Sequence, residues 1–365
     1  MTTSSTAMNE YNATIDAEGA ARLLQQTAGP VVVLTHAKPD GDAFGSVVAL
    51  TAALRSLDKS ATACFVPPLP ENLASLRGAE LAEIYSNSET QLPEAALYVV
   101  LDTGAWSQVG PMRQYIEPHL DRTLIIDHHL SGDVPAAHRH IDGDAAATCE
   151  ILAPILEQLL GGTLTTKDET LTRIIHDSLF VGIASDTGWF RFSNTRPRTH
   201  ELAAKLRRFG VDHAELYRQI EQSERMEKLA LLTRALDNLR LLAGGRAAIM
   251  ALRRADFDET GAYEEETERL IDVPQQVGAI QVIALVSESQ GDPDNGVEPA
   301  TRVSFRSKPG PGAVNVAELA GELGGGGHAR AAGAKLKQPL DEALPLIEQA
   351  VERALGGAVG DGPSR

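Results

Sequence analysis

Residues 34–46 read "LTHAKPDGDAFGS" and follow directly on the apolar run of residues 31–33. A run that is apolar on both faces is typical of a buried parallel strand, and a helical pattern begins near residue 43. His36, Asp40 and Asp42 therefore lie where a strand ends. Carboxylates gathered at one place repel each other unless a cation joins them, so this segment indicates a metal site.

Further apolar runs alternate with helical patterns along the first half of the chain. Strand-like runs occupy residues 62–66, 96–102 and 123–129, and helical patterns occupy residues 43–57, 147–160 and 168–185. Such alternation predicts an α/β fold with an open, mostly parallel sheet.

The second half of the chain has a different pattern. Three strand-like runs and three helical patterns are expected at 247–254, 280–289 and 300–308 and at 264–272, 314–323 and 341–355. We therefore expect a smaller α+β domain. The expected parts are a disordered extension (1–16), a metal-binding catalytic domain (17–211), a helical connector (212–243), the α+β domain (244–357) and a tail (358–365).

Composition excludes several kinds of protein. The 33 basic and 50 acidic residues give a net charge of −17, which argues against a clamp for long nucleic acid because such clamps need many cationic contacts to phosphate. A short anionic substrate held through metal ions remains compatible. No run approaches the roughly 20 apolar residues of a membrane span, and the polar N-terminus does not resemble a secretory signal. Cys64 and Cys149 lie in apolar stretches and are interpreted as small buried hydrophobic residues. We expect a cytoplasmic protein.

The acidic and imidazole groups recur at the ends of the predicted elements. Asp102 ends one strand, the sequence Asp127-His128-His129 ends another, and Asp186 ends a helical run. The carboxyl ends of parallel strands meet at one edge of the sheet, so four segments would deliver ligands to one place. A single aspartate at a strand end is as often a helix cap or a turn residue, but the combination favours metal binding.

Mixed oxygen and nitrogen ligands suit Mn²⁺ best, with Mg²⁺, Co²⁺ and Zn²⁺ as alternatives. The number of ligands exceeds that of one tetrahedral site. It suits two divalent metal ions about 3.5–4 Å apart, with one carboxylate bridging them.

These segments also resemble a known family. "HAKPDGDAFGS", "VLDTG", "IIDHH" and "SDTG" are similar to the four motifs of the DHH phosphoesterase superfamily, and "RSK" and "GGGGHARAAGAKL" resemble its C-terminal DHHA1 domain. Within the superfamily the layout resembles the bifunctional oligoribonucleases (nano-RNases) that also act as 3′-phosphoadenosine-5′-phosphate phosphatases. The match extends from about residue 20 to about residue 355. The resemblance also implies an active site in the cleft between the two domains.

The resemblance implies a role for each matching residue. One metal ion would be held by His36, Asp40 and Asp102, and the second by Asp42, Asp102, His128 and Asp186. Asp127 would orient an imidazole, and His129 would face the scissile phosphate as a hydrogen-bond donor or acid. In the second domain a substrate phosphate would contact Arg306, His328 and the backbone N–H groups of Gly325, Gly326 and Gly327.

Three features of this chain are open to other interpretations. The glycine run could be a flexible linker, but a loop without Cβ atoms also lets backbone N–H groups approach an anion. Phe190 and Phe192 are interpreted as core residues, whereas Trp189 suits the core and base stacking equally. Gln108 and Gly132 stand where related sequences often carry Arg and Asn.

The predicted function is a Mn²⁺-dependent phosphoesterase that uses a hydroxide activated by two metals. It would trim RNA of about two to five nucleotides, since the acidic surface disfavours long strands, and convert 3′-phosphoadenosine-5′-phosphate to AMP. Products of cyclic dinucleotides stay open as substrates, and so does a homodimer as the assembly. The alternatives are a single-strand DNA exonuclease, a manganese inorganic pyrophosphatase and a non-catalytic nucleotide sensor.

Overall fold

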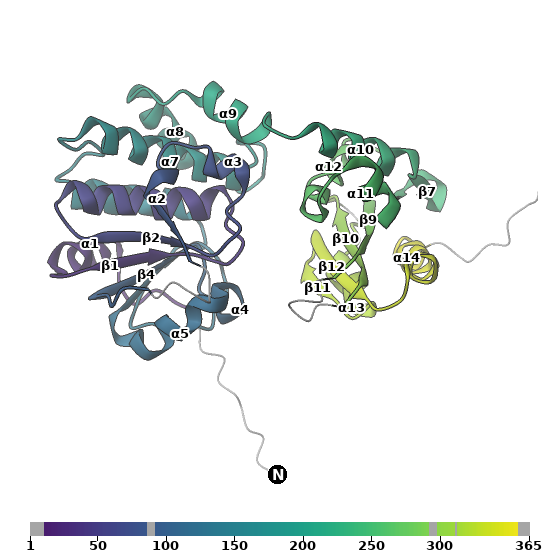
Figure 1. Cartoon of the computed structure of the whole chain (residues 1–365), viewed down its shortest axis with the longest axis horizontal. Helices are drawn as coiled ribbons and strands as arrows, with labels where there is room; N and C mark the ends of the chain where they lie inside the picture. The colour runs from purple at the N-terminus through teal and green to yellow at the C-terminus, as the bar shows by residue number, and fades with distance from the viewer. Residues whose placement is uncertain (1–10, 86–91, 292–297, 311, 357–365) are drawn as a thin grey trace, which may run out of the picture. The chain divides into compact units, whose positions relative to one another are not determined.

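The computed structural model describes residues 11–85, 92–291, 298–310 and 312–356. The chain divides into two compact units, Met1–Ser223 and Glu224–Arg365 (Figure 1). The tail expected at 358–365 and residues 1–10 of the expected extension lie outside the described residues.

The first unit is built on a six-stranded sheet in which every neighbouring pair runs parallel. The strand order β3-β2-β1-β4-β5-β6 reverses direction between β1 and β4, and ligands of open α/β sheets bind at such a switch point. The predicted α/β fold is therefore confirmed. The strands are β1 Val31–Leu34, β2 Ala61–Phe65, β3 Ala82–Ile84, β4 Leu97–Leu101, β5 Thr123–Asp127 and β6 His138–Ile141.

Helices cover both faces of this sheet. The longest, α2 and α7, lie side by side on one face with α1 and α6, over a core that includes Val31 and Val33 (Figure 1). The short helices α4 and α5 contribute to the core on the other face, with Val32 and Leu34. The helices of this unit are α1 Ala17–Gln26, α2 Gly41–Ser56, α3 Glu71–Ala74, α4 Trp106–Val109, α5 Arg113–Ile116, α6 Thr148–Leu159, α7 Glu169–Asp186, α8 Pro197–Arg208 and α9 His213–Glu221, with 3₁₀ turns at Ala79–Leu81, Gly110–Met112 and Glu117–Arg122.

Two strands of this sheet were not predicted. The strand β6, "HRHI", is polar and only half-buried, and β3 has three residues of which two are exposed. Neither shows an apolar run, because edge strands need not be buried on both faces. Their position at the two edges accounts for the missing signal.

Residues 11–16 correct the expected disordered extension. Thr14 and Ile15 donate backbone N–H groups to Arg139 O at 2.7 and 3.1 Å, and Arg139 donates its own N–H to Thr14 Oγ1 at 2.8 Å. Asp16 then caps helix α1 by accepting from Gly19 N. This segment is therefore ordered along the edge strand β6.

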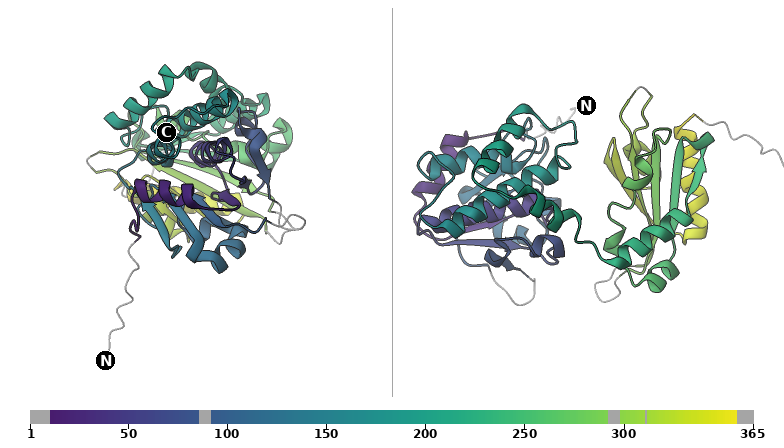
Figure 2. Two further views of the ribbon diagram at one scale, coloured as in Figure 1. Left: turned by 90° about the vertical axis from the view of Figure 1, so that its left-hand side faces the viewer. Right: turned by 90° about the horizontal axis from the view of Figure 1, so that it is seen from above.

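The second unit is built on a mixed sheet, which Figure 2 shows in green and yellow. The sheet has six strands in the order β11-β12-β10-β9-β8-β7, and only β8 and β9 pair in parallel within the described residues. Its strands are β7 Arg240–Leu242, β8 Ala247–Leu252, β9 Val282–Ser289, β10 Ala300–Ser307, β11 Gly326–His328 and β12 Ala331–Leu336. Its helices are α10 Met226–Asp237, α11 Arg254–Thr260, α12 Asp272–Gln275, α13 Val316–Glu322 and α14 Leu340–Ala354, with 3₁₀ turns at Ala243–Gly245 and Glu264–Thr267.

This second sheet is covered unequally. Helices α13 and α14 pack on one face, and α10 to α12 cover β8 and β9 on the other. Along β10 buried side chains alternate with exposed or half-buried ones; Val303 and Phe305 face α13 and α14, and Arg302, Ser304 and Arg306 lie on the second face. The described residues therefore leave β10, β12 and β11 uncovered on one side.

Two expectations for this region need correction. The predicted connector, residues 212–243, is divided between the units, since α9 belongs to the first and α10 and β7 to the second. The helix expected at 264–272 is a 3₁₀ turn followed by an irregular stretch before α12.

Candidate metal centre

The segment between β1 and α2 places three candidate ligands by helix capping and burial. Asp40 is the N-cap of α2 and accepts from the N–H groups of Asp42 and Ala43 at 3.0 Å each through Oδ1. Asp42, the second residue of the helix, is completely buried. Its two carboxylate oxygens accept the N–H groups of Thr148 and Cys149 at 2.5 and 3.0 Å.

These last two amides form the N-terminus of α6. The residue before it, Ala147, has no side chain that could cap the helix, so its first N–H groups need another acceptor. Asp42 supplies that acceptor, and the positive end of the helix dipole favours its negative charge. The helix therefore holds Asp42 at the carboxyl edge of the sheet.

Asp102 follows β4 in the left-handed region, with φ of 62°, a conformation that aspartate and asparagine tolerate better than most residues. Its buried carboxylate faces two imidazoles. His36 Nε2 lies 3.5 Å from Oδ2, and His128 Nε2 lies 3.4 Å from Oδ1. Thr148 Oγ1 donates to Oδ1 at 3.0 Å.

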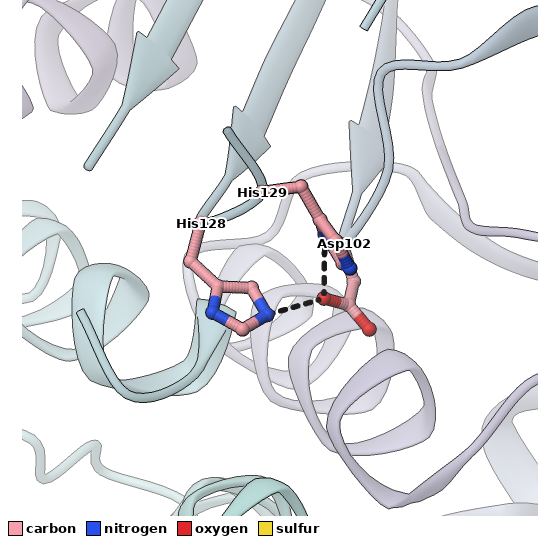
Figure 3. Close-up of side chains that lie close together, drawn as sticks. All are labelled: Asp102, His128 and His129. Atoms are coloured by element: carbon pink, nitrogen blue, oxygen red, sulfur yellow. Dashed lines mark ion pairs between the residues drawn. The ribbon is translucent and has the colours of Figure 1, made fainter. Parts of the chain in front are cut away.

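The sequence Asp127-His128-His129 lies at the end of β5. Figure 3 shows His128 and His129 both directed at Asp102, with His129 Nδ1 3.9 Å from Asp102 Oδ1. His128 also lies 3.2 Å from Asp186 Oδ2, and its Nδ1 lies 3.3 Å from Ala145 O. Asp127 is buried and does not join them. Its Oδ1 instead accepts from His129 Nδ1 at 2.7 Å and from His129 N at 3.1 Å.

Close packing of α2 on α7 brings Asp186 to this site. A Cβ atom at Gly45 would stand 2.3 Å from Ser178 O, and one at Gly182 would stand 2.6 Å from Asp42 Oδ1. Glycine at both positions therefore permits the contact between the helices. Asn194 Nδ2 then donates to Asp186 O at 3.1 Å and fixes the end of α7.

The charges of the cluster perturb one another strongly. Burial, together with Asp102 and Asp186, raises the pKa of Asp42 well above its ordinary value. Although Asp40 is exposed as a residue, desolvation of its carboxyl group and the same two aspartates raise its pKa to about 6. Burial opposes protonation of His128, but hydrogen bonds with Asp102 and Asp186 outweigh it and raise its pKa to about 11. The cluster without metal thus retains protons that a divalent cation would replace.

The donor set fits divalent metal ions. Three groups have ligand atoms that all lie within 4.8 Å of one another: His36 with Asp40 and Asp102, Asp42 with His128 and Asp186, and Asp102 with His128 and His129. All six ligands expected from the sequence are therefore brought together. The structure also places His129, expected to face substrate, where it could join them.

The residues expected in the second unit lie on one region of its sheet. Arg306 is a half-buried residue near the end of β10, opposite Ala331 of β12. Gly326, Gly327 and His328 are exposed, but they form the edge strand β11 rather than the predicted loop. Gly325 N–H donates to Ala320 O at 2.8 Å, so this amide is not free for a phosphate and its predicted role needs correction.

Only some of the aromatic residues after Asp186 lie where the sequence analysis expected them. Phe190 packs against the core and on Phe180, whereas Phe192 has 54% of its surface exposed, so its assignment to the core was wrong. Trp189 packs edge-on against Tyr217 and donates Nε1–H to Glu221 at 2.8 Å. Both cysteines are buried and free, as predicted.

Sequence reasoning missed Thr148, Asn194 and Tyr11 near the site. Thr148 begins a helix after three alanines, which reads as an ordinary start of a helix. Tyr11 lies in a polar segment without periodicity, and its hydroxyl donates to Asp127 Oδ2 at 2.7 Å.

None of the helices among the described residues has the length and apolar character of a membrane span.

Comparisons with known proteins agree with this geometry. The model of the DHH family, N-terminal domain, matches residues 30–183, and that of the DHHA1 domain matches residues 247–357. The chain is 33% identical over 341 residues to the bifunctional oligoribonuclease and PAP phosphatase NrnA of Thermus thermophilus, covering 92% of this chain and 93% of the relative. It is 27% identical to NrnA of Bacillus subtilis, covering 84% and 89%.

Solved structures show the same fold. An exopolyphosphatase-related protein from Bacteroides fragilis superposes with a TM-score of 0.81 at 21% identity, covering 93% of this chain and 96% of that one. RecJ from Thermus thermophilus in complex with Mn²⁺ superposes with a TM-score of 0.53 at 16% identity, covering 93% of this chain and 54% of that one. Since both domain models match and a relative is 33% identical over nearly its whole length, the chain belongs to the DHH family of phosphoesterases.

Proposed function

We propose that this chain is a Mn²⁺-dependent phosphoesterase that hydrolyses very short oligoribonucleotides to mononucleotides and 3′-phosphoadenosine-5′-phosphate to AMP. The observation that carries the proposal is the buried carboxylate of Asp102, approached by His36 on one oxygen and His128 on the other. Relatives named as oligoribonucleases and PAP phosphatases support this choice of substrates.

Two divalent ions would be held by this cluster. His36 and Asp40 would hold one, Asp42, His128 and Asp186 would hold the other, and Asp102 would contribute to both. When bound, such ions supply positive charge to a phosphate and lower the pKa of water. The raised pKa of Asp42 and of Asp40 supports this assignment, because crowded carboxylates gain from a cation.

His129 is proposed to handle the proton of the leaving group. Its side chain is 44% exposed, and the bond from Nδ1 to Asp127 leaves Nε2 on the other side of the ring for a substrate oxygen. That hydrogen bond also raises the pKa of His129. A protonated His129 would then donate a proton to the leaving oxygen.

The second unit is proposed to bind a substrate phosphate through Arg306, His328 and the glycine strand. On the uncovered face of β10, Arg302 lies directly across from Lys335 of β12. Like charges that face each other across a ladder destabilise it, which an anionic ligand would offset. This basic face supports an anionic substrate, although Arg302 also lies 3.9 Å from Glu264.

A substrate panel tests the proposal. Purified protein with Mn²⁺ is incubated with a labelled RNA dinucleotide, a long RNA, a single-stranded DNA, pyrophosphate, 3′-phosphoadenosine-5′-phosphate and a linear dinucleotide derived from a cyclic one. Hydrolysis of the dinucleotide and of phosphoadenosine phosphate is expected, with the long strands cut slowly. Hydrolysis of pyrophosphate alone would replace the proposal with the pyrophosphatase alternative. If no substrate is hydrolysed with any divalent metal ion, the result would favour a non-catalytic nucleotide sensor.

A further inference from the structure

Tyr11 reaches the candidate site from a segment that carries none of the family motifs. Its hydroxyl donates to Asp127 Oδ2 at 2.7 Å across 116 positions of sequence. The following residues are tied to β6 by Thr14 N and Ile15 N, which donate to Arg139 O, and by Thr14 Oγ1, which donates to Ala137 O at 3.1 Å. Tyr11 is therefore held at the site by a fixed segment.

The carboxylate that Tyr11 contacts is fully buried, and its two oxygens serve different partners. Oδ1 accepts from His129 N and Nδ1, whereas Oδ2 accepts from Tyr11. In the part of the chain that the structure describes, no other hydrogen bond to Oδ2 occurs. A buried carboxylate oxygen without a donor is costly, so removal of the Tyr11 hydroxyl would leave Asp127 free to rotate away from His129. Burial and the charge of Asp127 raise the pKa of Tyr11 far above 10.0, which keeps the hydroxyl protonated as a donor.

Two glycines make room for the tyrosine ring. A Cβ atom at Gly104 would stand 1.8 Å from the Tyr11 hydroxyl oxygen, and one at Gly132 would stand 2.5 Å from Tyr11 Cε2. Gly104 O also accepts from Asp133 N and Val134 N at 2.9 Å each, which joins the loops after β4 and β5. The ring therefore fills a slot between two loops that carry site residues. The space needed by the Tyr11 ring explains why glycine stands at position 132, where related sequences often carry Asn.

We propose that Tyr11 is a positioning residue for the reaction: its hydroxyl fixes the carboxylate of Asp127, which in turn holds the His129 imidazole in one orientation, with Nδ1–H toward Asp127. The inference rests on the role proposed for His129. It adds a residue from outside the family motifs to the machinery of this chain.

The test compares Tyr11→Phe with the wild-type protein. Phenylalanine keeps the ring in its slot and removes only the hydroxyl, so the fold and its melting temperature should be retained. We expect kcat on an RNA dinucleotide to fall about ten- to a hundredfold, as for other residues that orient a ligand or base, with KM changed less than about twofold. Tyr115→Phe is the matched control, because this substitution removes a hydroxyl contact with Tyr85 elsewhere in the same unit.

A second readout does not need activity. Histidine-selective ¹⁵N spectra of the metal-free protein should show the Nδ1–H group of His129 in a stable hydrogen bond in the wild type and a weakened or lost Nδ1–H signal in Tyr11→Phe. Gly132→Ala, which pushes a methyl group toward the Tyr11 ring, should change the His129 signals in the same direction. The control variant should leave them unchanged.

The outcomes separate this inference from the proposed function. If no substrate in the panel is hydrolysed by wild type, the function fails, while the His129 spectra still test the contact. If Tyr11→Phe leaves either kcat or the His129 signals as in the wild type, Tyr11 is no positioning residue and serves packing alone.

Discussion

His128 Nε2 lies 3.4 Å from Oδ1 of Asp102, a buried aspartate with φ of 62°. The other oxygen of the same carboxylate lies 3.5 Å from His36. A residue in the left-handed region is strained unless it is glycine, asparagine or aspartate. Aspartate tolerates this backbone conformation, and here the conformation directs one carboxylate at two imidazoles.

Asp102→Asn should therefore abolish activity without unfolding the protein. Asparagine tolerates the same backbone conformation, but its amide removes the charge shared by both candidate metal positions. We expect kcat/KM to fall at least about a hundredfold, equivalent to about 3 kcal/mol. Asp58→Asn is the matched control, because Asp58 is exposed and has φ of 58°. Equal activity of Asp102→Asn and wild type would exclude the shared carboxylate.

Asp40→Asn should separate stability from metal binding. Asparagine caps helices as well as aspartate does, so the bonds from Asp42 N and Ala43 N are retained while the charge repelled by Asp102 and Asp186 is lost. The metal-free variant should melt at or above the temperature of the wild type, and the rise in melting temperature on adding Mn²⁺ should shrink. Asp168→Asn, which removes a charge from the equivalent cap of α7, should keep the full rise. An undiminished rise in Asp40→Asn would remove Asp40 from the metal site.

Thr148 contacts two candidate ligands by different groups, which makes its side chain testable alone. Its N–H donates to Asp42 and its Oγ1 to Asp102. Thr148→Val keeps the shape and the N–H but removes the hydroxyl, and should lower activity or Mn²⁺ affinity about ten- to a hundredfold. Thr148→Ser should restore most of the loss, since it keeps the hydroxyl. If valine and serine variants behave alike, the hydroxyl has no part in holding Asp102.

The candidate metal ligands could be found from the sequence because two simple regularities coincide. Apolar runs mark the buried strands β1, β4 and β5, and the carboxyl ends of parallel strands share one edge of a sheet. A polar residue directly after each run is therefore a candidate for the same site. Asp102, His128 and the residues after β1 all follow this pattern.

Other features left no local signal in the sequence. The bond from α6 to Asp42 joins residues 106 positions apart, and Tyr11 lies in a polar segment that resembles a disordered tail. The strand β11 was predicted as a loop because glycine has low β-propensity. It forms a strand because it pairs with β12, and glycine permits the close approach: a Cβ atom at Gly327 would stand 2.6 Å from Ala332 Cα. Tertiary contact, which periodicity does not encode, decided each case.

His176 should make the stability of the first unit depend on pH. The ring is buried, stacks on Phe209 at 4.5 Å and contacts Leu164 O through Nε2 at 3.0 Å. Burial lowers the pKa of His176 below 6.5, so the unfolded chain takes up a proton first as the pH falls. The contribution of His176 to stability is complete above pH 6.5 and is lost below it, toward the lowered pKa.

Urea unfolding of metal-free wild type and His176→Gln from pH 8 to pH 5 measures this effect. The free energy of unfolding of the wild type should fall more steeply below pH 6.5 than that of the variant. Parallel curves would mean that His176 does not contribute to the acid sensitivity of the fold.

Arg306 tests the proposed role of the second unit, because a substitution there should weaken substrate binding and leave metal binding unchanged. Arg306→Ala removes a guanidinium from the uncovered face of β10, and hydrogen bonds to charged groups contribute about 1.5–3 kcal/mol. We therefore expect KM for an RNA dinucleotide to rise about tenfold or more, with the Mn²⁺-induced rise in melting temperature unchanged. Arg353→Ala, which removes the same charge from α14 on the opposite face of the sheet and breaks only a surface pair with Glu322, is the matched control. If Arg306→Ala lowers metal binding and substrate binding alike, its effect is structural. If it changes neither, the phosphate contact lies elsewhere on the chain.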